Sequence, residues 1–241
     1  MKRFSLLLAL FIISGNYIFA QTETDSIPKK KDWSKAQLSG RAADHFMLQL
    51  GYNGWSGDVD DINTKGLSRT FNMYFMYDFP FKSTPNFSAA AGVGVGTDNM
   101  FFKETYIDLT KSPLAFTNDT VNTYKKYKLA TTYLEIPVEL RYAANPANFN
   151  KSFKAAIGLK VGTMVDAHTK AKVSRDTQNN GGYSYRVKDR RNFNATRLAA
   201  TVRVGYGVFS VFGTYQINTF VKDGYGPNIR PYTIGLCISG L

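Results

Sequence analysis

The stretch TFNMYFMYDF, residues Thr70–Phe79, alternates strictly between two kinds of side chain. Its odd-numbered positions are all large and apolar, whereas its even-numbered positions mix threonine, asparagine, tyrosine, methionine and aspartate. Successive side chains of a β-strand point to opposite faces of the sheet, so a period of two predicts a strand with one fully apolar face.

Seven further segments repeat this pattern and fill nearly all of the chain after Ala43. No segment with a helical period competes with them, so the chain is predicted to be all-β. The seven segments are His45–Asn53, Phe87–Thr97, Thr132–Tyr142, Phe153–Val165, Thr196–Tyr206, Phe209–Thr219 and Tyr232–Ser239.

The connections between these segments alternate between long and short. This alternation is typical of an up-and-down barrel with one rim at the cell exterior and the other in the periplasm. We therefore predict an eight-stranded antiparallel up-and-down transmembrane β-barrel with both chain ends at the periplasmic rim. The long connections are roughly Gly54–Leu67, Lys103–Lys126, Ala171–Asn192 and Lys222–Arg230, and the short ones are Pro80–Asn86, Ala143–Lys151 and the turn at Gly205–Gly207.

Alternation alone leaves open which face of the barrel looks inward. The less apolar face is dominated by glycine, alanine, serine and threonine, which suits the narrow interior of eight strands better than a solvated exterior. The apolar faces also begin or end in aromatic residues, as they do at membrane interfaces. We expect the apolar face to meet lipid. The alternative is a soluble, lipocalin-like barrel with that face inside.

The N-terminus has the features of an export signal. Met1–Arg3 is basic, Phe4–Ile13 is apolar but too short to span a bilayer, and a polar stretch leads to Ala20. Residues 21–43 are polar, include three consecutive lysines and lack periodicity, which indicates a linker. We expect a signal peptide at 1–20, a periplasmic linker at 21–43 and a barrel domain at 44–241.

Composition leaves little material for catalysis or for metal binding. A single cysteine, Cys237, excludes an internal disulfide framework and a zinc site built on paired cysteines, and the chain has only two histidines. We predict no catalytic residue, no metal and no cofactor. A barrel hydrolase acting on lipid A or phospholipid stays open as an alternative, with His168 beside a loop serine, Ser174 or Ser184.

Charged residues on the small-polar face predict a filled lumen. A turn centred near Ala147-Asn148 sets Glu135 opposite Lys160, and Asp166 faces Arg197 if the third long loop centres on Gly181-Gly182. An eight-stranded interior is just wide enough for side chains, and buried charges need partners. We predict an acid–base network that closes the lumen and leaves no permanent water-filled channel. Its expected members are Glu135, Glu139, Arg141, Lys154, Lys160, Asp166, Arg197 and Arg203.

The long loops are basic, in a chain with a formal net charge of +12. Loops that face the exterior would meet the phosphates of lipopolysaccharide, an anion that suits lysine and arginine. The alternative is that these loop charges are simply solvated. Nucleic-acid binding is a poor interpretation, because the protein is predicted to be exported. The basic loop residues are Lys103, Lys111, Lys125, Lys126, Lys170, Lys172, Arg175, Lys188, Arg190 and Arg191.

Three segments resemble a known family. DHFMLQLGYNGW (Asp44–Trp55), YLEIPVELRY (Tyr133–Tyr142) and RPYTIGLCISGL (Arg230–Leu241) are similar to the outer-membrane beta-barrel domain family of Bacteroidota, the PorT-like small barrels. The resemblance implies an eight-stranded barrel in a Gram-negative outer membrane. It also implies a non-enzymatic, structural or accessory role in a cell-surface or secretion assembly, with other envelope proteins as partners. A narrow channel for small solutes is the second alternative.

Overall fold

The computed structural model describes residues 45–59, 62–64, 67–81, 83–118, 124–145, 151–173 and 184–240. The expected signal peptide and linker lie outside these residues. Within the described ranges no helix is long and apolar enough to cross a membrane.

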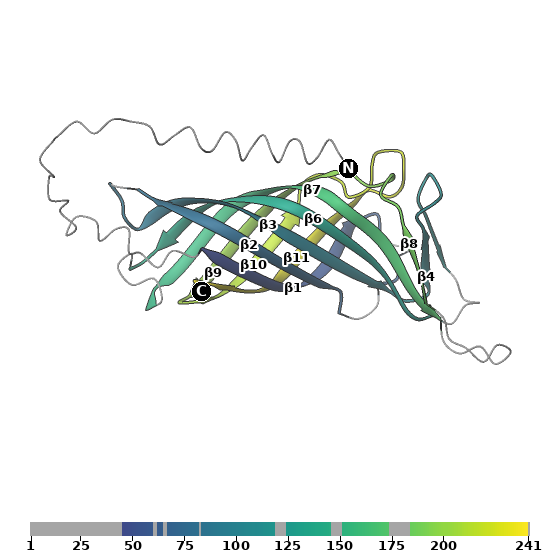
Figure 1. Ribbon diagram of the computed structural model, residues 1–241, viewed down its shortest axis with the longest axis horizontal. Coiled ribbons are helices and arrows are strands. Elements are labelled where there is room, and N and C mark those ends of the chain that lie inside the picture. The colour runs from purple at the N-terminus through teal and green to yellow at the C-terminus, as the bar shows by residue number, and fades with distance from the viewer. Residues whose placement is uncertain are drawn as a thin grey trace, which may run out of the picture. The chain divides into compact units, whose positions relative to one another are not determined.

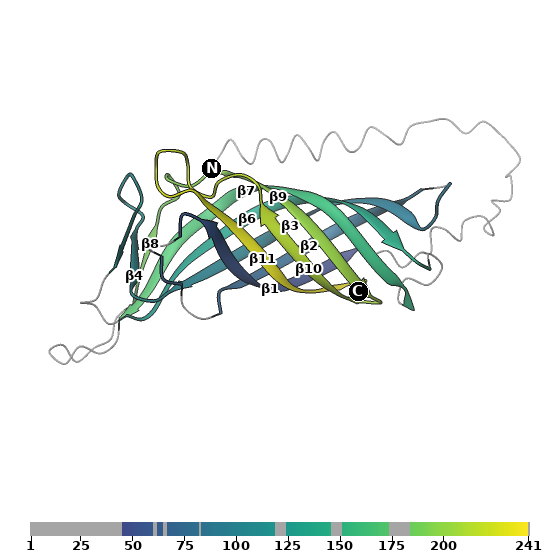
Figure 2. The ribbon, with the colours of Figure 1, turned by 180° about the vertical axis from the view of Figure 1, so that it is seen from behind.

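Eight strands form a closed barrel, and every neighbouring pair is antiparallel (Figures 1 and 2). The first strand pairs with both the second and the last, and the pair β6–β7 completes the ring. Each segment predicted from the sequence coincides with one barrel strand, so the predicted fold is confirmed. The barrel strands are β1 (Phe46–Gly57), β2 (Arg69–Pro80), β3 (Phe87–Phe102), β6 (Tyr124–Ala143), β7 (Phe153–Val173), β9 (Thr196–Tyr206), β10 (Phe209–Gln216) and β11 (Ile229–Ser239).

The apolar face of the barrel looks outward. In β2 exposed and buried residues alternate along nearly the whole strand, with Phe75 62% exposed and its neighbours Tyr74 and Met76 fully buried. Strands β6, β7 and β11 likewise expose leucine, isoleucine and valine. This arrangement gives the barrel a lipid-compatible belt and rules out the soluble, lipocalin-like alternative.

The two ends of the barrel differ. We call the end with the long connections, after β1, β3, β7 and β10, the loop end, and the end with the short connections and both barrel termini the turn end. Three strands run well past the predicted segments at the loop end, so that β6 has 20 residues and β7 has 21. The described part of the loops adds a hairpin, β4 (Thr105–Asp108) with β5 (Ala115–Asn118), and a short strand β8 (Ser184–Lys188) paired to β7.

The chemistry of the two strand faces inverts toward the loop end. In the belt, β6 points Leu134 and Ile136 outward and Glu135 inward, whereas beyond it Lys128 points outward and Tyr127 and Leu129 are buried. A segment above the lipid meets water on its outside, so its apolar side must face in. The segment predicted from the sequence begins only at Thr132, where this inversion lies, and therefore omits the first part of β6.

A bulge changes the direction of side chains in β7. Thr132 pairs with Asp166 and Tyr133 with Met164, so Val165 has no partner in β6. An extra residue in one strand shifts its alternation by one. Met164 and residues before it at even positions face the lumen, whereas after Val165 the buried residues are Ala167, Thr169 and Ala171.

The loops pack into a hydrophobic cluster over the loop end of the barrel. Trp55 lies with its ring centroid 5.4 Å from Phe102, 6.3 Å from Phe116 and 5.7 Å from Phe220. Tyr127 Oη donates to the Ile107 carbonyl at 2.8 Å, which ties the hairpin to β6. We call this group the loop-end cluster. Its buried members are Ile62, Met100, Phe102, Ile107, Leu109, Leu114, Tyr127, Leu129, Tyr133, Met164, Ala167, Ala171, Phe193, Phe220, Val221 and Ile229.

The orientation of β11 gives a direct chemical test of the fold. Cys237 is fully buried, and its neighbour Leu236 is 64% exposed on the belt. We expect Cys237 in the folded, detergent-solubilised protein to resist a small maleimide and to react after heat unfolding. A Leu236→Cys, Cys237→Ser variant should react while folded. Rapid labelling of Cys237 in the folded protein would contradict this assignment of faces.

Candidate functional site

Buried charge gathers in the barrel lumen. Within the described strands, nine acidic and basic side chains from five strands lie there with at most 9% of their surface exposed. Four carboxylates face five cations, so the interior is nearly balanced although the chain as a whole is strongly basic. These residues are Asp78 of β2, Asp98 of β3, Glu135, Glu139 and Arg141 of β6, Lys154 and Lys160 of β7, and Arg197 and Arg203 of β9.

Arg197 is the centre of the group nearer the loop end. Its Nη1 lies 2.9 Å from Asp98 Oδ2 and 3.2 Å from Glu135 Oε1. Its guanidinium carbon also lies 4.8 Å from the ring centroid of Tyr133, at cation–π distance. One cation thereby joins β9 to β3 and β6 across the lumen.

Lys160 extends this group toward the other side of the barrel. Its Nζ donates to Gln49 Oε1 and to Tyr74 Oη, both at 3.1 Å, and Tyr74 in turn donates to Glu135 Oε2. The ammonium also lies 4.9 Å from the ring centroid of Tyr74. Residues of β1, β2, β6, β7 and β9 therefore belong to one connected set.

A second group lies nearer the turn end. Glu139 Oε2 accepts from Arg141 Nε at 2.9 Å and from Arg203 Nη2 at 3.2 Å. Arg141 Nη1 is 3.7 Å from Asp78 Oδ1, and Arg203 also donates to Ser239 Oγ at 3.2 Å. Charge-assisted hydrogen bonds of this kind are the strong ones in a desolvated interior.

Three glycines of β3 make room for the large lumen side chains. A Cβ on Gly94 would lie 2.4 Å from Tyr74 Cδ1, and one on Gly96 would lie 3.1 Å from Glu135 Oε2. A Cβ on Gly92 would lie 2.5 Å from the sulfur of Met76. The GVGVG stretch is thus a packing surface on the inside of the barrel, as its alternation on a strand predicts.

A family comparison fits this architecture. The family model described as "Outer membrane protein beta-barrel domain" matches residues 19–222, which is most of the chain.

The chain belongs to this outer-membrane β-barrel family.

Among solved structures, two of the attachment invasion locus protein Ail of Yersinia pestis are similar, and each alignment covers 80% of this chain and 94% of Ail. One shows 11% identity with a TM-score of 0.33. The other, a complex with the heparin analogue sucrose octasulfate, shows 13% identity with a TM-score of 0.32. No curated protein matches the sequence.

Seven of the eight residues predicted for the lumen of this family member are buried there. The predicted register is off by two positions, because Glu135 lies opposite Gly162 and Lys160 lies opposite Pro137. Lys154 is buried and lies opposite Ala143.

The predicted position of Asp166 is wrong, because this residue does not lie in the lumen and does not face Arg197. The bulge at Val165 turns it to the outside of β7, where Oδ2 lies 2.7 Å from His168 Nδ1 and 3.1 Å from Arg186 Nη2. Its Oδ1 lies 2.6 Å from Lys188 Nζ. Asp98 takes the predicted place beside Arg197.

Several lumen partners were not predicted from the sequence, among them Gln49, Tyr74, Asp78, Asp98 and Ser239. Asp78 and Tyr74 stand on the mixed face of the stretch that predicts the fold. Asp98 continues the glycine alternation of β3 one position beyond the predicted end at Thr97. The alternation of β3 therefore places Asp98 on the inner face as well, but the predicted strand stops one residue before it.

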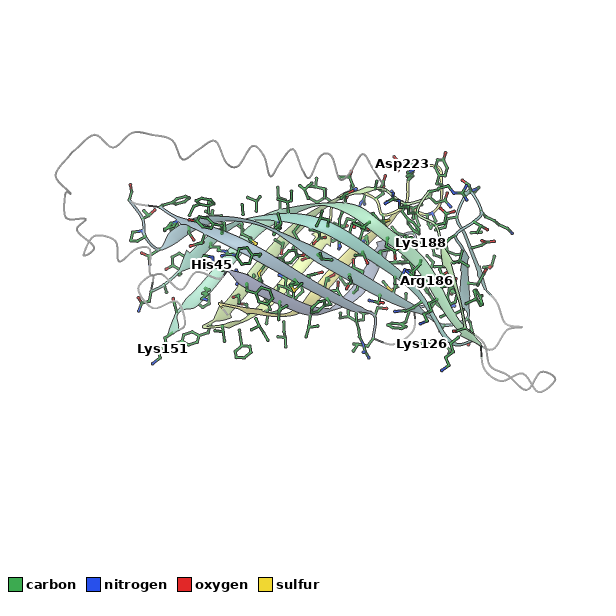
Figure 3. All side chains as sticks on the ribbon, viewed as in Figure 1. His45, Lys126, Lys151, Arg186, Lys188 and Asp223 are labelled. Carbon is green, nitrogen blue, oxygen red and sulfur yellow. The ribbon has the colours of Figure 1, made fainter. Side chains whose placement is uncertain are left out.

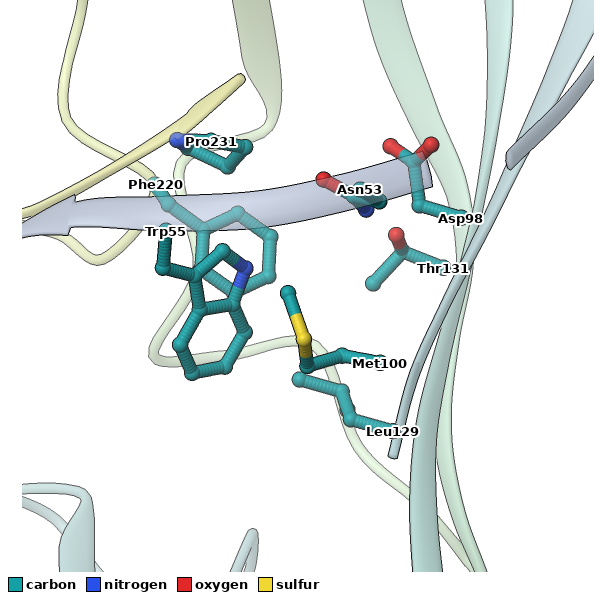
Figure 4. A pocket seen from close by; sticks show the side chains of 8 residues that line it. All are labelled: Asn53, Trp55, Asp98, Met100, Leu129, Thr131, Phe220 and Pro231. Carbon is teal, nitrogen blue, oxygen red and sulfur yellow. The ribbon is translucent and has the colours of Figure 1, made fainter. Parts of the chain in front are cut away.

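A small pocket separates the charged lumen from the loop-end cluster (Figure 4). Asp98 and Thr131 stand on one side of it, and Trp55 and Phe220 on the other. Its remaining lining residues are Asn53, Met100, Leu129 and Pro231.

The described residues hold no cluster of three metal-ligating side chains. His168 is engaged by Asp166, and Ser184 lies opposite Lys172, four register positions from the partner of His168. Four positions correspond to about 13 Å along a strand, too far for a catalytic pair. Ser174 lies outside the described residues.

Neutralising a carboxylate should cost more in the lumen, at Glu139, than on the outside of the barrel, at Asp166. Glu139→Gln leaves Arg141 and Arg203 in the lumen without their shared carboxylate, so we expect a loss of about 3–5 kcal/mol in unfolding free energy. Asp166→Asn is the matched control, because its partners Arg186 and Lys188 are more than half exposed, and it should cost at most about 1 kcal/mol. Urea unfolding in detergent measures both. Equal losses would contradict a desolvated lumen network.

Proposed function

We propose that this chain is a non-enzymatic outer-membrane β-barrel protein, a structural or accessory component of a cell-surface or secretion assembly, with its lumen closed by the charged network. The observation that carries the proposal is the filled interior. Glu135 and Lys160 meet through Tyr74 in the middle of the lumen, and both are at least 98% buried. An eight-stranded barrel filled with side chains supplies a rigid lipid-anchored platform.

The loop end is the part of this platform that a partner would meet. Long connections of bacterial outer-membrane barrels lie on the extracellular side, so we place the loop end outside the cell. Here the described loops are held by specific contacts: Leu114 N donates to the Tyr225 carbonyl at 2.7 Å, and Asn192 Nδ2 donates to the Lys111 carbonyl at 2.6 Å. A folded surface of this kind favours a role in binding.

The finer parts of the proposal come from the sequence. The resemblance to PorT-like barrels favours an origin in Bacteroidota and a secretion or surface assembly as the setting. Outer-membrane lipid and lipopolysaccharide are the expected surroundings, with other envelope proteins as partners.

Site-specific photo-crosslinking in native membranes tests the accessory role. A photo-reactive amino acid at Tyr225, which is 44% exposed at the loop end, should give a defined protein adduct in the native host. The same probe at the exposed turn-end residue Lys151 reports on a periplasmic partner (Figure 3). A specific adduct at either position that is absent after expression in a foreign host supports the proposal. A chain that stays free of adducts at both positions contradicts it.

A further inference from the structure

The outer side of the barrel carries a dense group of cations near the loop end. Figure 3 shows Lys126, Arg186 and Lys188 along one band of the barrel on this side. Lys126 lies on β6, and Arg186 and Lys188 lie on β8; β7 lies between these two strands and pairs with both. We call this group the basic face, and it consists of Lys126, Lys128, Lys170, Lys172, Arg186 and Lys188.

The register sets like charges directly against one another. Lys128 lies opposite Lys170, and Lys170 lies opposite Arg186, so three cations form one row across three strands. Lys126 and Lys172 form a second opposed pair. Like charges placed directly opposite one another in a sheet are destabilising, so the arrangement costs stability in the protein alone.

Protein carboxylates relieve only part of this repulsion. Asp166 is the single acid on the outward side of these strands within the described residues, and it pairs with Arg186 and Lys188. Lys128 Nζ instead donates to the neutral Asn99 Oδ1 at 2.6 Å, and Lys126 Nζ lies 5.1 Å from the ring centroid of Phe101. Within the described residues, none of the four lysines that β6 and β7 contribute to the basic face lies within 4 Å of a carboxylate.

The basic face lies beyond the aliphatic part of the belt, on the side of the loop end. The last aliphatic residues on the outside of these strands are Leu134 in β6 and Val165 in β7, both more than half exposed. Lys128 lies six residues beyond Leu134, which is roughly 20 Å along the strand and roughly 15 Å in height for the usual strand tilt. Thr132 and Ala130 stand at the outward positions of β6 in between, and Ala130 is covered by its neighbours.

We propose that the basic face binds the phosphate groups of an anionic outer-leaflet glycolipid, lipopolysaccharide, from the side of the barrel. Charge complementarity selects this ligand, because phosphate oxygens are negatively charged and accept hydrogen bonds from the N–H groups of lysine and arginine. Asp166 holds Arg186 and Lys188 in place, and the bound phosphates neutralise the opposed lysines. The proposal rests on the loop end lying outside the cell, as proposed above.

The test compares two triple variants of the full chain with equal loss of charge. Lys128→Gln, Lys170→Gln and Arg186→Gln remove the central row of the basic face. The control replaces three exposed loop-end lysines away from it, Lys103, Lys111 and Lys222, with glutamine. Each protein is reconstituted with phosphorylated lipid A or with chemically dephosphorylated lipid A, and both the retained lipid and the thermal midpoint are measured.

We expect the wild type and the control to retain phosphorylated lipid A and to melt at a higher temperature with it than with the dephosphorylated form. The basic-face variant should retain at least tenfold less. In detergent without lipid it should be as stable as the wild type or more stable, because its like-charge repulsion is gone. Lys170→Glu should also lose lipid A while gaining stability, since it pairs with its two cationic neighbours.

Equal retention by the two triple variants overturns the proposal. Binding of soluble heparin to the basic face with no preference for phosphorylated lipid A also overturns it, in favour of a soluble polyanion. A separate arm labels Asp223→Cys and Lys151→Cys on intact cells with an impermeant maleimide. Labelling of Lys151→Cys alone would overturn the orientation, and the lipid proposal with it, even if lipid A binds in vitro. Failure of the wild-type protein to retain phosphorylated lipid A, with normal labelling of both cysteine variants, overturns the lipid site alone.

Discussion

The narrowness of an eight-stranded barrel is the constraint on which the rest of this structure depends. Its interior is only as wide as the side chains that fill it, so no charge placed there keeps its hydration. Arg197, Glu139 and Lys160 are each held by partners from other strands. The same contacts that satisfy the charges tie the strands together across the lumen and occupy the space that a solute would need.

The chemistry of the strands follows from what lies on each side of them at each height. In the belt, lipid requires apolar residues outside, and the lumen accepts paired charges. Above the belt, water lies outside, and the interior of β3, β6 and β7 fills with the loop-end cluster. Strand β6 passes through both environments and keeps the same alternation. Leu134 in the belt and Lys128 above it both point outward, whereas Glu135 and Leu129 both point inward.

Much of this fold could be predicted from the sequence because the belt leaves a strong period-two signal. The eight strands follow from that signal, their antiparallel order from the alternating long and short connections, and the outward apolar face from the small residues of the other face and the aromatic ends of the strands. The long strand extensions could not be predicted in the same way. The prediction relied on an apolar outer face and a polar inner face, whereas the extensions have lysines outside and apolar residues inside. The β4–β5 hairpin depends on tertiary contacts such as the one between Tyr127 and Ile107.

The lumen residues were predictable as a set but not as pairs. Alternation places Glu135, Glu139, Lys160 and Arg197 on the inner face, whereas pairing depends on register, which a turn of uncertain length leaves open by two positions. Asp166 shows the other limit, because a single bulged residue, Val165, reverses the face of everything after it. A bulge of this kind leaves no distinct mark in the local sequence.

Electrical conductance across a planar bilayer shows most directly whether the charged lumen is closed. We expect the purified wild-type barrel to give no steady, large conductance. A Glu139→Ala, Arg203→Ala variant that remains folded should leak ions, because it opens space at the turn-end group. A steady, large conductance from the wild-type protein would mean that the lumen is open and that the barrel is a channel.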